Sequence, residues 1–178
     1  LTGGTNGTAD GESHQKYLDK IERYSFNAMG VTTEDDSTKE LYISFCKRLR
    51  DEVGKKFQLV VYNKKADYEG VVNLLNDVTD GATKADLVYW VTGLIAGVAV
   101  NKSCTNTKYD GEYTVNVDYT QAQLEQAIKD GEFTLQQNDD NICVLSDINS
   151  LVTTTDTKGN DFKSNQTNYK TNDCIENN

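Results

Sequence analysis

The chain has 178 residues, of which 37% are hydrophobic and 26% charged, and this composition can build a domain-sized core. Its 18 basic and 28 acidic side chains give a formal net charge of −10, which argues against binding nucleic acid or inserting into an anionic membrane, because both need a cationic face. His14 is the single histidine, so one chain cannot supply a multi-histidine metal site, and proline is absent. The longest apolar run, Leu87–Val100, is shorter than the about 20 residues that a membrane-spanning helix needs.

The 4 cysteines are far apart in the sequence and form no C-x-x-C pair, which excludes zinc ribbons and thioredoxin-type motifs. They are Cys46, Cys104, Cys143 and Cys174, of which Cys46 and Cys143 fall in apolar stretches, where a buried free thiol is the usual outcome. The low cysteine density predicts a reducing compartment rather than a disulfide scaffold.

The hydrophobic pattern of the first hundred residues predicts helix, strand, helix, strand, strand and helix, at about 12–24, 26–31, 37–53, 57–62, 68–76 and 83–100. Ser37 with Glu40, and Thr83 with Asp86, have the spacing of capping boxes that open helices, and Gly54 stands where a helix ends. The last of these helices is apolar on nearly every side, so we expect it to be buried on most of its surface. This order of elements is typical of an α/β fold with parallel crossovers.

The remainder of the chain is more polar. After a tyrosine-bearing connection over 101–118, Thr120 with Gln123 predicts a short helix. The segments 132–136 and 142–145 predict a hairpin around Asn138–Asn141. The predicted fold class is therefore α/β, with a parallel or mixed sheet flanked by helices, followed by a small α+β C-terminal part with a hairpin. We expect an α/β core domain over 1–103, the α+β part over 104–167 and a disordered polar tail over 168–178.

Four kinds of motif could carry chemistry, and each has a simpler explanation. Gly3–Gly7 lacks the Gly-Lys-Ser/Thr of a phosphate loop and the G-x-G-x-x-G spacing of a dinucleotide loop, which favours a tight turn. Gly93 and Gly97 form a GxxxG that predicts close approach of another backbone. His14 is interpreted as a surface histidine. Three acidic pairs are interpreted as solvent-facing turn residues: Asp35-Asp36, Asp110-Gly-Glu112 and Asp139-Asp140. We therefore predict no catalytic, cofactor-binding or metal-binding residue.

One stretch, Asp86–Gly111 (DLVYWVTGLIAGVAVNKSCTNTKYDG), resembles the tail sheath proteins of contractile phage tails and of phage-tail-like particles of the defective prophage type. The resemblance covers about residues 1–167 and consists of many short matches in the same order rather than one diagnostic motif. The other matching segments are Leu1–Gly7, Lys47–Tyr62, Ala66–Val72, Tyr119–Phe133 and Val144–Thr153.

The resemblance implies a structural subunit, not an enzyme, that forms stacked six-membered rings around a tail tube and contracts to drive that tube through a target envelope. It implies partners in further sheath subunits, the tube protein and the baseplate, and a place in a virion or phage-tail-like particle, such as a bacteriocin, assembled in the bacterial cytoplasm. In this family, terminal arms add strands to neighbouring subunits. We expect both arms to be missing here, and the chain alone to be a monomer or weak dimer at micromolar concentration. The alternative is a small α/β ligand-binding domain or enzyme that uses the Gly3–Gly7 turn.

Overall fold

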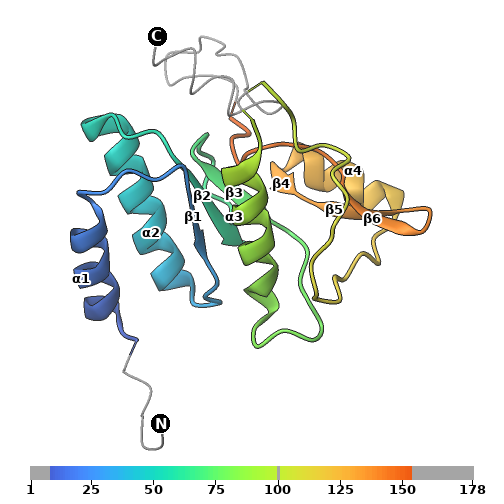
Figure 1. The fold of residues 1–178 in the computed structure, drawn as a ribbon, viewed down its shortest axis with the longest axis horizontal. Coiled ribbons are helices and arrows are strands. Elements are labelled where there is room, and N and C mark those ends of the chain that lie inside the picture. The colour runs from blue at the N-terminus through green and yellow to red at the C-terminus, as the bar shows by residue number, and fades with distance from the viewer. Residues whose placement is uncertain (1–8, 100, 154–178) are drawn as a thin grey trace, which may run out of the picture.

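The computed structural model describes residues 9–99 and 101–153, which form a parallel four-stranded sheet with helices on both faces and a separate two-stranded hairpin (Figure 1). The sheet has the order β1-β2-β3-β4, and this confirms the predicted fold class. The strands are β1 (Ala28–Val31), β2 (Gln58–Tyr62), β3 (Val71–Leu74), β4 (Glu132–Phe133), β5 (Leu135–Asn138) and β6 (Asn141–Val144). The helices are α1 (Gly11–Ile21), α2 (Asp36–Arg48) with a π-helical end (Leu49–Val53), a 3-10 turn (Lys84–Asp86), α3 (Leu87–Gly97) and α4 (Gln121–Lys129).

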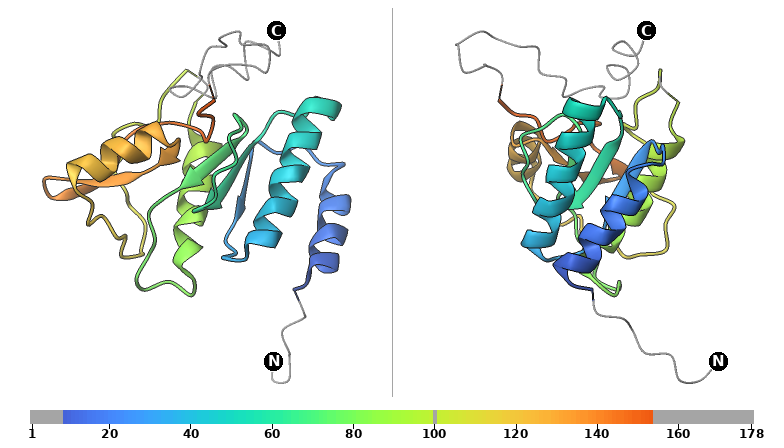
Figure 2. Two further views of the ribbon diagram at one scale, coloured as in Figure 1. Left: turned by 180° about the vertical axis from the view of Figure 1, so that it is seen from behind. Right: turned by 90° about the vertical axis from the view of Figure 1, so that its left-hand side faces the viewer.

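The central strand β2 separates two hydrophobic cores. Leu59 and Val61 point to the face covered by α1 and α2, whereas Val60 points to the face covered by α3, and all three side chains are fully buried. Figure 2 shows the helices on the two sides of the sheet. A strand that is covered on both faces needs apolar side chains on both of them. This explains the nearly continuous apolar run over 57–62.

Helix ends follow local hydrogen bonding, and one predicted cap is wrong. The side chain of Asp35 accepts from Thr38 N at 2.7 Å and so caps α2, in place of the expected pair Ser37 and Glu40. Asp35, two residues before Ser37, competes well for this position because its carboxylate is a strong acceptor at a helix N-terminus. At the other end, Gly54 adopts φ 79°, the left-handed conformation that glycine tolerates best, as predicted.

The second half of the chain returns to the first sheet. After β3 the chain forms α3, which packs over β1 and β2. The connection over 98–120 then leads to α4, and the chain returns to the sheet as β4, which pairs with β3 (Figure 1). The prediction of Glu132 as the start of a hairpin is therefore wrong, because Glu132 and Phe133 pair in parallel with Asn73 and Leu74. The hairpin is formed by β5 and β6 with Asp139 at φ 50° in the turn, so its predicted turn is confirmed.

The end of the described chain is fastened to the start of β3. Ser150 N donates to Val71 O at 2.8 Å, and the Ser150 hydroxyl donates to Tyr68 O at 2.9 Å. Asp67 Oδ1 accepts from Val152 N at 2.8 Å and from Thr153 N at 2.9 Å. These bonds fix the place and direction in which the chain leaves the sheet.

Candidate functional site

Helix α3 has one buried face and one exposed face. The side chains of Leu87, Val88, Val91 and Ile95 are fully buried against the sheet, at the i, i+1, i+4, i+8 spacing of one helix side. The expectation that this helix is buried on most of its surface holds for the sides that face the sheet and its flanks but not for the side opposite the sheet. The opposite side carries Tyr89, Gly93, Ala96 and Gly97, which are all exposed, and we call these four residues the α3 face.

The α3 face carries no charge. The run from Leu87 to Asn101 has no acidic or basic side chain, and Tyr89 is 64% exposed. Among residues 9–99 and 101–153, a Cβ added at Gly93 or Gly97 would meet no atom within 4 Å beyond its chain neighbours and the backbone of its own helix. The close backbone approach predicted from the GxxxG spacing is thus not made by any part of the described residues.

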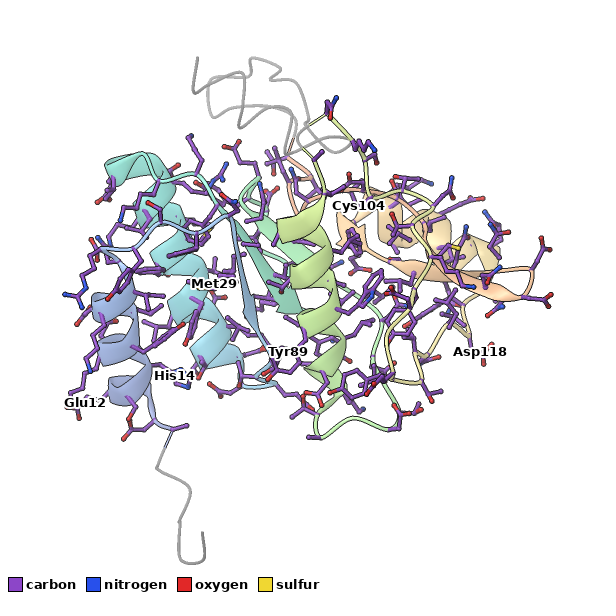
Figure 3. The ribbon with its side chains drawn as sticks, viewed as in Figure 1. Glu12, His14, Met29, Tyr89, Cys104 and Asp118 are labelled. Carbon is purple, nitrogen blue, oxygen red and sulfur yellow. The ribbon has the colours of Figure 1, made fainter. Side chains whose placement is uncertain are left out.

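Contacts on both flanks hold α3 rigidly. The Trp90 indole N–H donates to Asp110 Oδ1 at 2.8 Å, and the Trp90 ring meets Tyr109 edge-on with centroids 4.9 Å apart. On the side of β1, a Cβ at Gly30 would lie 2.2 Å from Thr92 Oγ1, so only glycine lets the helix sit this close to the strand. The face is therefore presented by a fixed scaffold rather than by a loop, with Tyr89 at its N-terminal end (Figure 3).

His14, interpreted from the sequence as a surface histidine, is partly exposed and contacts a side chain of another helix. Its Nδ1 lies 3.0 Å from the Tyr42 hydroxyl, and the two rings meet edge-on. The pair joins α1 to α2 and borders a hollow of about 390 Å³ beside β1 that also contacts Met29 and Gly30. Burial raises the pKa of Tyr42, so its hydroxyl remains protonated at neutral pH. The contact gives this histidine a structural role between the two helices.

The acidic pairs lie at separate places in the fold, and their carboxylates have structural roles there. Asp35 caps α2, and its hydrogen bonds from Thr38 lower the pKa of that carboxyl group. Asp36 pairs with Lys39 at 3.1 Å, Asp110 holds Trp90, and Asp139 turns the hairpin. The structure does not bring these carboxylates together as a catalytic acid and base would require.

Metal and membrane chemistry find no support in residues 9–99 and 101–153. Within these ranges no group of three or more His, Cys, Asp or Glu side chains could hold a metal ion. Nor does any helix there have the length and apolar character to cross a bilayer. Cys46 and Cys143 are buried as predicted, and Cys104 is buried as well. Cys174 and the Gly3–Gly7 turn, on which the enzyme alternative rested, lie outside the described residues.

Sequence reasoning marked Gly93 and Gly97 but missed the other two residues of the α3 face, Tyr89 and Ala96, and did not show that this side of the helix is exposed. The signal was present in residue size: positions 87, 88, 91 and 95 hold branched aliphatic side chains, while 93, 96 and 97 hold glycine or alanine. Both sets are apolar on a hydropathy scale, so the periodicity of hydropathy alone did not separate the buried side from the exposed one.

Comparison with known proteins identifies this arrangement. The family model described as phage tail sheath protein central domain matches residues 7–150. The phage-like element PBSX protein XkdK of Bacillus subtilis (strain 168) is 34% identical over 174 residues, which cover 93% of this chain and 37% of that protein. The crystal structure of the sheath tail protein from Desulfitobacterium hafniense matches with a TM-score of 0.82 and 36% identity, over 96% of this chain and 41% of that one.

A more distant structure shares the fold alone. The helical sheath of the anti-feeding prophage in its contracted state is 12% identical and matches with a TM-score of 0.59, over 91% of this chain and 46% of that one. The chain thus spans less than half the length of these relatives. The prediction of a structural rather than enzymatic protein agrees with these matches. With a family match over most of its length and relatives above 30% identity, the chain belongs to the phage tail sheath protein central domain family.

Proposed function

We propose that this chain is the central part of a sheath subunit that forms stacked six-membered rings around a tail tube and contracts to drive the tube through a target envelope. The observation that carries the proposal is the family match over residues 7–150. The partners would be further sheath subunits, the tube protein and the baseplate. The place of action would be a virion or phage-tail-like particle assembled in the bacterial cytoplasm.

The fold suits this mechanical role. Two independent cores, one on each side of β2, brace the sheet, so the domain can move as a rigid body. Contraction requires two packings of such bodies, which differ in the contacts between subunits rather than in the fold of each one. The energy for contraction would then be stored in those contacts when the extended sheath is assembled.

The proposal is tested in a chimera in which this chain replaces the matching 41% of the D. hafniense sheath tail protein. The chimera and the unaltered sheath protein are each produced with the tube protein from the same tail. We expect both to yield sedimentable tubular particles by negative-stain microscopy. A chimera that is folded and soluble but never forms tubes, while the unaltered protein does, would contradict the proposed function.

A further inference from the structure

We infer that the segment directly before α1, Leu1–Thr8, adds a strand to the sheet by pairing with the outer edge of β1. This contact lies within one chain, so it is independent of the proposed assembly of subunits. Four features support it: the open edge of β1, the position of α1, a hollow that both elements line, and the place where the chain enters α1.

Strand β1 is at one end of the sheet, and its outer side is open. Gln58 N of β2 donates to Asn27 O at 3.1 Å, and the two strands pair in parallel with Ala28 opposite Gln58. Because successive residues of a strand point their backbone groups to alternate sides, the N–H and C=O groups of Ala28 and Gly30 point away from β2. No other strand of residues 9–99 and 101–153 lies on that side, and Gly30 is exposed. Such an edge is a template for one more strand.

Helix α1 lies where the crossover helix of a further parallel strand would lie. In the unit β1–α2–β2, the helix joins two neighbouring parallel strands and covers one face of the sheet. Leu18 places α1 on that same face, and α1 is the outermost element on the β1 side of the sheet (Figures 1 and 2). A strand beside β1 that leads into α1 would step across the sheet in the same direction as β1–α2–β2. It would therefore form a crossover of the same hand, and nearly all parallel crossovers share one hand.

A hollow of about 390 Å³ is lined by both α1 and β1. Helix α1 contributes His14 and Tyr17, and β1 contributes Met29 and Gly30 (Figure 3 labels His14 and Met29). Tyr17 belongs to the apolar side of α1, but its side chain is 49% exposed, whereas Leu18 beside it is buried. A strand in the hollow would cover the Tyr17 ring and also give the outward backbone groups of β1 their partners.

The entry of the chain into α1 selects the occupant. Ala9, which precedes the cap residue Asp10, itself lines the hollow, so Leu1–Thr8 joins the described chain there. Eight extended residues reach about 26 Å, about twice the length of the 4-residue β1. Leu1–Thr8 has no charged side chain to bury, and Asn6-Gly7 is a turn signal that suits the change from strand to helix. A tethered segment also acts at a high effective concentration, which favours it over a free chain from solution.

The test is amide hydrogen exchange, followed by NMR, in the full chain and in a chain that begins at Ala9. That chain retains Asp10, whose side chain accepts from Ser13 N and caps α1. A chain that ends at Thr153 is the matched control, because it loses the opposite terminal segment and keeps Leu1–Thr8. Nuclear Overhauser contacts between Leu1–Thr8 and β1 in the full chain report whether the added strand runs parallel to β1. Thermal unfolding checks that each chain is folded.

We expect the amides of Ala28 and Gly30 to exchange at least about tenfold faster once Leu1–Thr8 is removed. The amides of Met29 and Val31 point towards β2 and should stay within about twofold. The control truncation should leave all four amides as they are in the full chain. We expect the Overhauser contacts to show a parallel strand.

Amides of Ala28 and Gly30 that exchange freely in the full chain would overturn the inference, because nothing would then pair with this edge. Amides that stay protected in the chain beginning at Ala9 would also overturn it, since another occupant, such as a second copy, would then cover the edge. Equally faster exchange of all four β1 amides would show that Leu1–Thr8 only steadies α1, and an antiparallel strand would contradict the crossover. None of these measurements involves rings or a tube, so their failure is distinguishable from failure of the chimera.

Discussion

The side chain of Asn76 binds the backbone of Leu135 as a paired strand would: Oδ1 accepts from Leu135 N at 2.7 Å, and Nδ2 donates to Leu135 O at 3.0 Å. The same Nδ2 donates to Asn116 O at 2.9 Å. Asn76 is fully buried and follows β3, while Leu135 begins β5 and residue 116 belongs to the long connection. One amide group thus joins the sheet, the connection and the hairpin.

This junction makes Asn76 a sensitive position. Asn76→Ala leaves the backbone groups of Leu135 buried without partners, so we expect a loss of about 2–4 kcal/mol in the free energy of unfolding, measured with urea. Asn27→Ala, at an exposed asparagine before β1, serves as the control and should change stability by less than about 0.5 kcal/mol. Equal losses in the two variants would show that the junction does not contribute in this way.

The close approach of α3 to β1 should depend on Gly30. A methyl group there would lie 2.2 Å from Thr92 Oγ1, so Gly30→Ala should cost about 1–3 kcal/mol through overpacking. Gly11→Ala adds the same methyl group in open space within a helix and should be neutral or slightly stabilising. Urea unfolding of the two variants measures the difference, and a Gly30→Ala protein as stable as the wild type would contradict the packing described.

The two sides of α3 should respond differently to substitution. Ile95 is fully buried, so Ile95→Ala should cost about 2–5 kcal/mol, whereas Ala96→Asp on the exposed side should cost no more than about 1 kcal/mol, from its lower helix propensity and its place in the last turn. Leu94 is half-buried, and we expect Leu94→Ala to fall between the two. Thermal unfolding of the three variants gives the order, and a strongly destabilised Ala96→Asp protein would mean that this side is covered within the monomer.

Asp86 links stability to pH. Its carboxylate is buried and accepts from Thr83 Oγ1 and Ala82 N, each at 2.7 Å, and these bonds, above all those from Thr83, lower its pKa below the ordinary 3.8. A group with a lowered folded-state pKa stabilises the protein above the unfolded-state value, and this contribution is lost as the pH falls through the folded-state pKa. We expect Asp86→Asn to reduce stability at neutral pH and to lessen its decline below about pH 4. The free energy of unfolding is measured with urea from neutral pH to below about pH 4, with Asp140→Asn in the exposed hairpin turn as the control. Identical dependence of stability on pH in the wild type and in Asp86→Asn would show that Asp86 does not link stability to pH.

The sequence predicted those parts of the fold that rest on short-range patterns. The nearly continuous apolar run over 57–62 predicted a covered strand, and every residue from Phe57 to Val61 is buried. The spacing of Thr120 and Gln123 predicted the capping box that begins α4. The errors lie where a long-range contact decides the outcome. Glu132 and Phe133 are too short a segment to show that they join β3, from which they are separated by more than fifty residues.

The candidate site was predictable only in part. The GxxxG spacing marked Gly93 and Gly97, but a periodicity that mixes glycine, alanine and leucine does not say which side of the helix the sheet covers. The side that the sheet covers is set by the packing of α3 on β1, where Gly30 lies close to Thr92. The contact between His14 and Tyr42 joins two helices and likewise leaves no trace in local spacing.

The proposed sheath role is tested most directly by end-on views of the chimeric particles in electron microscopy. Class averages of the chimera bound to its tube report the symmetry of each ring and its contact with the tube in one measurement. We expect six subunits in each ring with the tube at the centre, and the same for the unaltered D. hafniense protein imaged in parallel. Rings of another symmetry, or folded chimera that leaves the tube bare, would contradict it.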